Sequence, residues 1–402
     1  MSFKNIYLKI KKMEQIINSI LDNDLYKFTM QMAVIQKFPL AKVRYAFINR
    51  GETEFPEGFD VELRKQIKLM EILGLSKKQK RWIKEKCIFF TPTYIDFLEG
   101  YRFDSSEIGI IQTGGKLEIS ISGFWYRTIL WEVPLMALIS ELFFKMTDQN
   151  PWNETKREEN NDKKFSLFKL NGIHFAGFAT RRRFSYEIQA EFIKQASSRI
   201  GFNNFVGTSN VHLAYLNNII PIGTHAHEWF MFHAAKYGYK MANHLAMENW
   251  VDVFRGDLGI ALSDTFTTEV FFKSFDKKFA KLYDGIRHDS GDPIEFADKA
   301  IAHYKKLGID PRTKVIIFSD GLNPQKAAGI KDYCRGSIMC SFGIGTNFSN
   351  DVGVTPLNMV IKIIAAKPEG EDWLHTIKLS DSIGKHTGDK KEIEIAKYVL
   401  KI

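Results

Sequence analysis

The chain has 402 residues, of which 45% are hydrophobic and 13% aromatic, a composition that excludes a disordered or low-complexity protein. One hydrophobic core rarely grows beyond about 250–300 residues, so this length predicts two or three domains. The formal charge of +9 comes from lysines scattered along the chain rather than from one basic block, which favours small anionic substrates over nucleic acid as partners.

Disulfides and targeting signals are not expected. The three cysteines are too few and too irregularly spaced for a disulfide framework or a zinc site. The lysine-rich residues 1–12 break every apolar run, so no signal peptide is expected. The most apolar stretch, residues 129–144, is interrupted by two glutamates and a proline, so no membrane span is expected either. A cytoplasmic location is therefore predicted.

The first third of the chain predicts mixed helices and strands. Apolar residues at helical spacing predict a helix within residues 13–37, capped by Asp22 or Asn23. The alternating stretch 42–50 predicts a strand. Further elements are expected in order, namely helices at 61–73 and 77–86, then strands at 108–112 and 116–122 joined by a glycine turn. These elements together predict an α+β layer.

From residue 175 onward, short apolar or glycine-rich strand ends alternate with helix-like segments. The strand ends read FATRRR, FVGTSN, PIGTHAHE, IALSDT, GIRHDSGD, IIFSDGLN and SFGIGTN. About seven such units predict an α/β fold with an irregular, closed or nearly closed parallel barrel, whose active site lies at the carboxyl ends of the strands. We expect residues 126–349 to form this barrel domain, and residues 1–125, joined by the tail 350–402, to form the α+β domain.

The strand-end segments carry residues suited to anions. Three consecutive arginines beginning at Arg181 offer planar donors to phosphate or carboxylate, although an exposed basic cluster would have the same sequence. Gly343 and Gly345 are typical of a turn whose backbone N–H groups approach a phosphate. Arg287 and Asp289 flank a glycine turn in which carboxylates could bind ribose hydroxyls, or Mg²⁺ through water.

The segment PIGTHAHEWF at residues 221–230 places His227 at an expected helix start. A neutral imidazole can act near pH 7 as a base, a metal ligand or a phosphate acceptor. The N-terminus of a helix favours an anion, so a phosphoryl group on His227 would be stabilised there. A helix cap with incidental histidines is the alternative interpretation.

Eight segments taken together resemble the ordered landmarks of nicotinate phosphoribosyltransferases. They are LDNDLYKFTM, FATRRRFS, GTSN, PIGTHAHEWF, IALSDTF, GIRHDSGDP, FSDGLN and SFGIGTN, and they span residues 21–351. The resemblance implies the type II phosphoribosyltransferase fold and a homodimer with active sites at its interface. It also implies that nicotinate, 5-phosphoribosyl 1-diphosphate, ATP and water give nicotinate mononucleotide, diphosphate, ADP and phosphate, in NAD salvage.

The resemblance implies a role for each matched catalytic residue. His227 corresponds to the histidine that ATP phosphorylates, and Asp264 to the carboxylate that orients it. Asp289 is expected to hold the ribose hydroxyls and stabilise the charge that develops on the sugar. Mg²⁺ is expected to be bound through the diphosphate and water, without a direct protein ligand.

The same resemblance implies the substrate contacts. Phe178 and Tyr26 would sandwich the pyridine ring, with Tyr26 donated by the second subunit. Arg181 and Arg287 would line this pocket, and Ser209 stands where nicotinamide-using relatives carry an acid, which favours nicotinate. The remaining binding residues are expected around the ribose and the 5-phosphate, namely Asp320, Gly321, Gly343, Gly345 and Thr346.

Other functions remain open on the sequence alone. A nicotinamide or quinolinate phosphoribosyltransferase is the alternative within the same class. A metallohydrolase would use the cluster His225, His227, Glu228 and His233, although the tight spacing of these residues argues against convergence on one ion. A basic nucleic-acid binder is a third interpretation.

Overall fold

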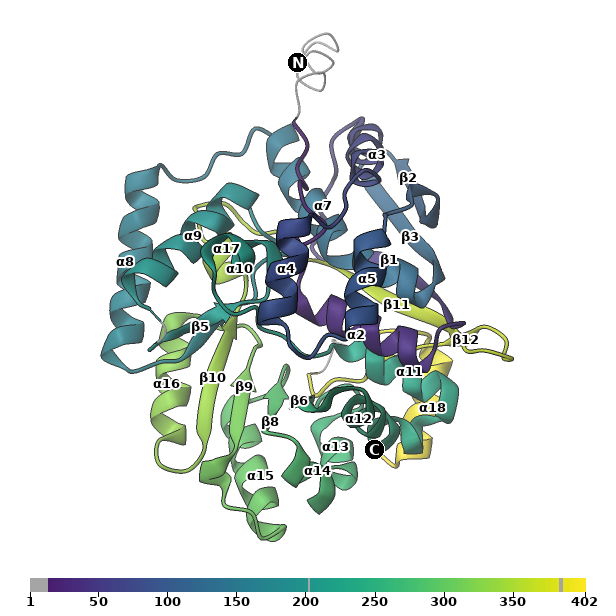
Figure 1. Cartoon of the computed structure of the whole chain (residues 1–402), viewed down its shortest axis with the longest axis vertical. Coiled ribbons are helices and arrows are strands. Elements are labelled where there is room, and N and C mark those ends of the chain that lie inside the picture. Colours follow the sequence, from purple (N-terminus) through teal and green to yellow (C-terminus); the bar gives the residue numbers. More distant parts are fainter. Residues whose placement is uncertain (1–13, 202, 383–385) are drawn as a thin grey trace.

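The computed structural model describes residues 14–201, 203–382 and 386–402. Residues 1–12, which underlie the expectation about a signal peptide, lie outside this range. Of the helices in the described ranges, none combines the length and the apolar character needed to cross a membrane. Two β-sheets organise the described chain (Figure 1).

The first sheet is antiparallel and joins the two ends of the chain. Its strand order is β12-β11-β1-β3-β2. The strands are β1 (Lys42–Asn49), β2 (Ile108–Thr113), β3 (Lys116–Phe124), β11 (Met359–Lys367) and β12 (Leu374–His375). β1 pairs with β3 on one side and with β11 of the tail on the other. β1 and β11 lie side by side in Figure 1. The tail thus folds back into this sheet, while the domain boundaries at residues 125 and 350 remain predictions.

Helices lie around this sheet, and two of them begin after a residue whose side chain caps the first turn, namely Ser76 and Thr91. They are α2 (Leu25–Lys37), α3 (Phe59–Met70), α4 (Lys77–Lys86), α5 (Pro92–Gly100), α6 (Trp125–Thr128) and α7 (Glu132–Met146). Ser76 and Gln79 form a reciprocal capping box at the start of α4. The predicted first helix begins only at Leu25, because the chain before it follows a turn and Asp24 pairs with Asn210.

The second sheet is parallel and has six strands in the order β5-β4-β10-β9-β8-β7, fewer than the seven or so units expected. They are β4 (Phe175–Gly177), β5 (Phe205–Thr208), β7 (Ile260–Leu262), β8 (Gly285–His288), β9 (Val315–Phe318) and β10 (Met339–Ile344), and β6 (Arg255–Leu258) precedes β7.

A closed barrel is not confirmed, because the pairings within the described residues do not join β7 to β5. The segment 221–224 lies between these two edges. The amide of Ile222 donates to the Thr208 carbonyl at 2.8 Å, and the Thr224 hydroxyl donates to the Ile260 carbonyl at 3.2 Å. This segment therefore connects the edges through single hydrogen bonds instead of a seventh strand.

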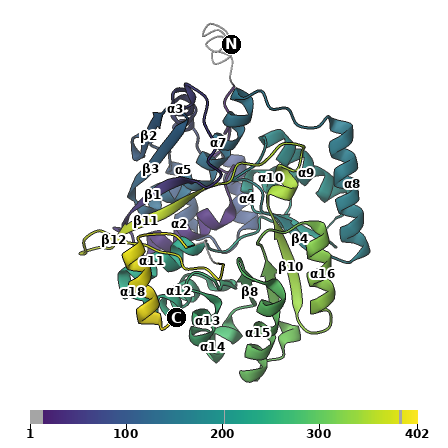
Figure 2. The ribbon, with the colours of Figure 1, turned by 180° about the vertical axis from the view of Figure 1, so that it is seen from behind.

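The later helices lie around the parallel sheet or between it and the tail: α15 and α16 lie beside β8 to β10 in Figure 2, whereas α11 packs on β11 and α18 on α12. The helices are α8 (Glu154–Leu170), α9 (Tyr186–Arg199), α10 (Val211–Asn217), α11 (His227–Tyr237), α12 (Tyr239–Phe254), α13 (Thr268–Ser274), α14 (Lys277–Leu282), α15 (Pro293–Lys306), α16 (Pro324–Cys334), α17 (Thr346–Ser349) and α18 (Lys390–Leu400). Asp292 and Asn323 cap α15 and α16, and each cap is followed by a proline that cannot donate there anyway. The short α17 follows the carboxyl end of β10 directly, and α11 begins near the chain that follows β8, where His227 contacts Asp289.

Candidate active site

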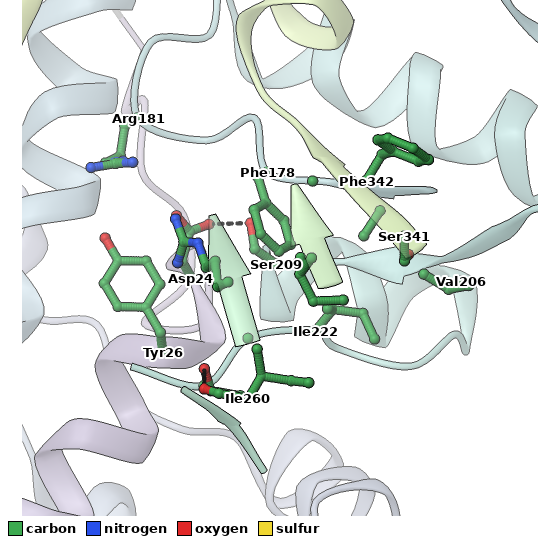
Figure 3. Close-up of a pocket in the computed structure, with 16 residues that line it drawn as sticks. Asp24, Tyr26, Phe178, Arg181, Val206, Ser209, Ile222, Ile260, Ser341 and Phe342 are labelled. Carbon is green, nitrogen blue, oxygen red and sulfur yellow. Dashed lines mark hydrogen bonds between the residues drawn. The ribbon is translucent and has the colours of Figure 1, made fainter. Parts of the chain in front are cut away.

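An aromatic cavity of about 220 Å³ lies at the carboxyl ends of the parallel strands (Figure 3). Phe178, directly after β4, and Tyr26, on α2, face it from different sides. Gly343 on β10 makes room for the Phe178 ring, because a Cβ at that position would lie 2.5 Å from ring carbons. Arg287 lies over the same ring, 5.7 Å from its centroid. The cavity can therefore hold a flat aromatic ring between two others.

Tyr26 lines the cavity of its own chain, which differs from the expectation that a second subunit donates it. The backbone places it there, because Leu25 N–H donates to the Ser209 carbonyl at 2.8 Å and Asp24 bridges to Asn210. The start of α2 is thus hydrogen bonded to the loop after β5. No second chain is needed to bring this ring to the cavity.

Ser209 lies at the cavity, but its hydroxyl has protein partners. It lies 2.7 Å from Asp24 Oδ1 and 3.2 Å from the Gly177 carbonyl, both of them acceptors. The expected donation from Ser209 to a substrate carboxylate therefore needs a change of partner. Asp24 is a further acid of this cavity, and its place in the sequence did not indicate a role.

A second, more polar cavity of about 440 Å³ adjoins the first. The two share Phe178, Arg181, Arg287 and Gly343. The second cavity brings together most of the residues expected around phosphate and ribose, namely Asp289, Gly321, Gly343, Gly345 and Thr346, together with Arg182, Ser319 and Asn323. Asp320 lies between two lining residues but does not itself line this cavity.

His227 opens helix α11, as the sequence predicted, and three side chains surround its ring. Its Nδ1 lies 2.9 Å from Thr265 Oγ1. Its Nε2 lies 2.8 Å from the Lys378 ammonium and 3.1 Å from Asp289 Oδ2. The Lys378 ammonium can only donate, so it pairs with the form of the ring in which Nε2 is bare and Nδ1–H donates to Thr265. The Asp289 carboxylate can only accept, so it pairs with the form in which Nε2 carries the hydrogen.

Burial first and the Lys378 ammonium second lower the pKa of His227 to about 4, against the opposing effect of Asp264 and Asp289. The ring is therefore neutral near pH 7 and keeps a nucleophilic lone pair. Although burial opposes it, the Arg287 guanidinium and His227 hold the pKa of Asp289 well below its usual value. Asp289 is thus an anion, with Arg287 at 3.0 Å and the Ser319 hydroxyl at 2.7 Å.

Asp264 does not orient the histidine in the way the resemblance implied. Its nearest oxygen lies 3.8 Å from Nε2 of His227, beyond hydrogen-bond distance, and Thr265 holds the other ring nitrogen instead. Asp264 contacts Lys378 at 3.1 Å and accepts from the Ser290 hydroxyl at 2.6 Å. It is fully buried, and its charge raises the pKa of His227 directly while its carboxylate also holds Lys378 in place.

Direct ligation of a cation here does not fit these contacts. Ligand atoms of His227, Asp264 and Asp289 lie within 4.8 Å of one another, a spacing that could hold an ion. The Lys378 ammonium, however, lies within 3.1 Å of two of the three residues and supplies the positive charge. Mg²⁺ bound through a phosphorylated ligand is compatible with this arrangement.

The histidine cluster of the metallohydrolase alternative does not converge. His225 is buried and accepts from the amide of Leu262, and His233 contacts the Trp229 carbonyl at 2.7 Å. Glu228 points away from the cavity mouth into a buried cluster. These side chains satisfy the local backbone or the core, so this alternative loses its ligands.

That buried cluster supports Arg181 from behind. Lys27 is fully buried and lies 2.5 Å from a carboxylate oxygen of Glu132 and 2.5 Å from one of Glu228. Tyr45 donates to the second oxygen of Glu228 at 2.8 Å, and Arg181 approaches the second oxygen of Glu132 at 3.4 Å. Buried charges are tolerated only when they are paired in this way. The cluster therefore helps to hold the guanidinium of Arg181 in place.

The three consecutive arginines divide between the site and the core. Arg181 and Arg182 line the second cavity. Arg183 is fully buried and forms a bidentate pair with Asp22 at 2.7 and 2.8 Å, so it joins the loop after β4 to the chain before α2. The sequence pattern did not separate these roles, because all three arginines lie in the same loop.

Lys378 is a neighbour of His227 that the sequence did not indicate. It belongs to a segment after β12 that crosses the site, where Leu379 N–H donates to Thr265 and Asp381 N–H to Ser290. A lysine in the segment HTIKLSD has no local pattern that marks a site. Only the position of the tail relative to α11 brings its ammonium to His227.

Both cavities open where the parallel strands end, which is where α/β enzymes bind their substrates. With arginines and glycines on one side and two aromatic rings on the other, the fold and site define an α/β enzyme acting on anionic substrates, one of them aromatic. Comparison with known families makes this specific. Residues 173–402 match the model of the nicotinate phosphoribosyltransferase (NAPRTase) family, and residues 21–140 match that of its N-terminal domain. The chain belongs to the nicotinate phosphoribosyltransferase family.

Individual relatives agree along nearly their whole length. The chain is 57% identical over 384 residues to a nicotinate phosphoribosyltransferase of Chromohalobacter salexigens, covering 96% of this chain and 98% of the relative. It is 52% identical over 378 residues to one of Desulforapulum autotrophicum, covering 94% and 97%. The crystal structure of the Porphyromonas gingivalis enzyme superposes with a TM-score of 0.93 at 45% identity, covering 96% of this chain and 100% of that one. The chain is thus an enzyme of this type.

Proposed function

We propose that the chain couples ATP hydrolysis to the synthesis of nicotinate mononucleotide from nicotinate and 5-phosphoribosyl 1-diphosphate, through phosphorylation of His227, in NAD salvage. One observation carries the proposal. The aromatic cavity and the arginine- and glycine-lined cavity meet at Arg287, which contacts Asp289, which in turn contacts His227. The two substrates and the histidine can therefore act within one connected site.

Nicotinate is assigned to the aromatic cavity. Tyr26 and Phe178 would stack on the two faces of the pyridine ring, and Arg181 or Arg287 would pair with its carboxylate. The ring nitrogen would then point toward the second cavity, where the ribosyl donor binds. The names of the relatives support nicotinate over nicotinamide or quinolinate.

The transfer step relies on position and charge. Diphosphate leaves C1 of the ribose while the pyridine nitrogen attacks from the opposite face. Asp289 is partly buried and anionic, so it can stabilise the positive charge that develops on the sugar after exchanging contacts with Ser319 or Arg287. The 5-phosphate would lie against Gly321, Gly343, Gly345 and Thr346. Mg²⁺ would neutralise the leaving diphosphate.

His227 would accept the γ-phosphoryl group of ATP on Nε2, in the form of the ring in which that atom is bare. The phosphorus–nitrogen bond forms as the bond to the ADP oxygen breaks, and water later releases phosphate. The new group carries about −1.5 to −2 charges beside Asp264 and Asp289, so Lys378 and Arg287 would supply the compensating charge. Binding of the ribosyl donor would tighten as this charge reorders the loops.

The experiment that tests the phosphohistidine uses γ-labelled ATP. The label should enter the chain, survive alkali, be lost in acid, and map to the peptide containing His227. His227→Ala should remove the label and make product formation independent of ATP. Label on another residue, or ATP stimulation that persists in His227→Ala, would contradict the mechanism.

The substrate assignment has its own test. Product formation is measured with nicotinate, nicotinamide and quinolinate under identical conditions. We expect turnover with nicotinate to exceed turnover with the other two by at least about 100-fold, the size of effect that one unpaired buried polar group produces. Preference for nicotinamide would transfer the chain to the alternative activity.

A homodimer and a cytoplasmic location remain proposals. The family resemblance supports the dimer, although Tyr26 lines its own chain's cavity. Sedimentation analysis should give about twice the 46.4 kDa of one chain. A single-chain mass at micromolar concentration would exclude an obligate dimer.

A further inference from the structure

Asp24 is an acid in a cavity assigned to an acidic substrate. Its side chain is buried at 3% exposure and lines the cavity beside Tyr26 and Phe178. Its Oδ1 accepts two hydroxyl donors, from Ser209 at 2.7 Å and from Thr180 at 2.7 Å. Within the described residues its Oδ2 has no hydrogen-bond donor, although it is not sealed from the cavity. Figure 3 shows the Asp24–Ser209 bond at the cavity wall.

The hydrogens at this wall are already used. Ser209 has one hydroxyl proton, and Asp24 lies 0.5 Å closer to it than the other acceptor, the Gly177 carbonyl (2.7 against 3.2 Å). When the Ser209 hydroxyl donates to Asp24 Oδ1, both Ser209 Oγ and Asp24 Oδ2 present lone pairs to the cavity. A carboxylate ligand that approached an ionised Asp24 would therefore meet like charge without a donor between them.

The charged groups around Asp24 allow it to hold a proton. Burial raises the pKa of Asp24, while the Ser209 and Thr180 hydroxyls and the Arg181 guanidinium oppose the rise and Glu132 adds to it. On its own helix, burial raises the pKa of Tyr26 well above the usual value, so Tyr26 stays neutral, and Lys27 is paired with Glu132 and Glu228. When a substrate carboxylate pairs with Arg181, the positive charge that keeps Asp24 ionised is largely neutralised.

We propose that the Asp24–Ser209 pair takes up one proton from solvent when nicotinate binds and thereby becomes a donor to the substrate carboxylate. The inference rests on the proposed function of this cavity. The proton can lie on Asp24 Oδ2 and bond the substrate directly, or lie on Oδ1 and bond Ser209, whose own hydroxyl then turns to the substrate. In both cases one proton is gained on binding and returned when the product leaves.

The same pair treats the amide analogue differently. Nicotinamide carries N–H groups, and an ionised Asp24 can accept hydrogen bonds from them without any proton uptake. Raising the pH by one unit above the pKa of Asp24 should therefore weaken nicotinate binding about tenfold and leave nicotinamide binding unchanged. The pair would thus make selectivity between acid and amide depend on pH.

Calorimetry of the whole enzyme measures the proton directly. Nicotinate and nicotinamide are titrated at the same pH into the wild-type chain in two buffers with different protonation enthalpies. We expect nicotinate binding to take up protons at a pH above the pKa of Asp24 in the free enzyme, and nicotinamide binding to take up none. Nicotinate binding without proton uptake would overturn the inference but leave the proposed function intact, whereas absence of saturable nicotinate binding would overturn both.

Variants identify the group that takes up the proton. Asp24→Asn imitates the protonated acid, so it should bind nicotinate with no proton uptake and with an affinity that does not change with pH. Glu118→Gln, an exposed site on β3, is the matched control and should behave like the wild type.

A nearby lysine needs its own arm of the experiment. Burial, Lys378 and Arg50 lower the pKa of Lys362 to about 7, so an anion binding near it could also draw in a proton. Lys362→Met should keep the proton uptake if Asp24 is the acceptor. Uptake that persists in Asp24→Asn, or that disappears in Lys362→Met, would assign the proton elsewhere and overturn the inference; the second result holds even if Asp24→Asn does not fold.

Discussion

His227 illustrates how its neighbours decide what one side chain can do. Free imidazole is half protonated near pH 6.5, where its lone pair is often occupied. Burial and the Lys378 ammonium shift the pKa of His227 to about 4, so the lone pair is available throughout the physiological range. Because the folded-state pKa is below the ordinary value, this histidine contributes stability that is present above pH 6.5 and lost as the pH falls from 6.5 toward 4.

The pH dependence of phosphorylation follows from that shift. The initial rate of labelling from γ-labelled ATP should stay constant from pH 8 down to about pH 5 and fall only near pH 4. Rapid-quench labelling, with circular dichroism at each pH to confirm that the chain is folded, measures this. A half-maximal rate near pH 6.5 in folded protein would show that the histidine titrates like a free one.

Lys378→Met tests the residue that the sequence missed. The change removes a charge-assisted hydrogen bond to Nε2, which is worth about 1.5–3 kcal/mol and corresponds to roughly a 10- to 100-fold slower phosphorylation. The pKa of His227 should rise at the same time, because the lysine charge holds it down. Lys401→Met is the control, because Lys401 is an exposed residue next to the C-terminus. An unchanged labelling rate would remove Lys378 from the mechanism.

At the scale of single elements, two strands depend on glycine, because close neighbours leave no room for a side chain. β10 carries Gly343 where the Phe178 ring lies against the strand, and β8 begins with Gly285 where the neighbouring strand approaches closely. A Cβ at Gly285 would lie 2.0 Å from the Val315 carbonyl oxygen. Glycine at these two positions is required by close packing, since a side chain would clash with a ring in one case and a backbone in the other.

Gly343→Ala should affect nicotinate more than stability. The methyl group displaces the Phe178 ring and weakens one face of the aromatic stack, by about 0.5–1.5 kcal/mol or a roughly 2- to 12-fold higher KM for nicotinate. Steady-state kinetics gives this value, and Gly329→Ala, whose Cβ would have no atom within 4 Å, is the control. Equal KM values for the two variants would show that Phe178 does not contact the substrate.

Gly285→Ala should lower the stability of the fold more than the activity of the site. The clash with the Val315 backbone separates β8 from β9 and should lower the free energy of unfolding by about 1–3 kcal/mol. Gly100→Ala at the end of α5 has open space around it and should change stability by no more than about 1 kcal/mol. Chemical denaturation compares the two. A Gly285→Ala chain as stable as the Gly100→Ala chain would contradict the packing described for this sheet.

At the scale of the whole molecule, the tail joins the sheets and completes the site. β11 pairs with β1 over eight residues of that strand, and the following segment brings Lys378 to His227. The chain must therefore be nearly complete before the antiparallel sheet gains its last strands and Lys378 reaches His227. Because these contacts join residues far apart in sequence, we expect the chain to fold more slowly than a helical protein of the same size.

Truncation tests this dependence on the tail. A chain ending at residue 357 lacks β11, the segment with Lys378 and α18, and leaves β1 unpaired on one side. We expect no cooperative thermal unfolding, because a large apolar face loses its cover. A chain ending at residue 389, which lacks only α18, should unfold cooperatively at a modestly lower Tm. Cooperative unfolding of the shorter chain would show that the first sheet is stable without its tail strand.

Much of the local structure could be predicted from sequence. Glycine-rich strand ends and β/α alternation indicated the parallel sheet, and the start of α11 placed His227 correctly, because strand ends and caps depend on residues that are neighbours in the chain. The same local patterns overestimated the strands, since the segment 221–224 has a strand-like sequence but makes only single hydrogen bonds. The family resemblance supplied most of the site residues, yet not their contacts.

Sequence by itself determined the elements, the chemical types of the site residues and the family, because propensity, capping and motif spacing act over a few residues. Tertiary structure alone decided that Lys378, 151 positions from His227, contacts its ring, that Thr265 rather than Asp264 holds Nδ1, and that Asp24 lines the aromatic cavity. These contacts follow from the order of strands and the return of the tail. Such long-range geometry depends on how apolar faces pack across the whole chain, which no short segment encodes.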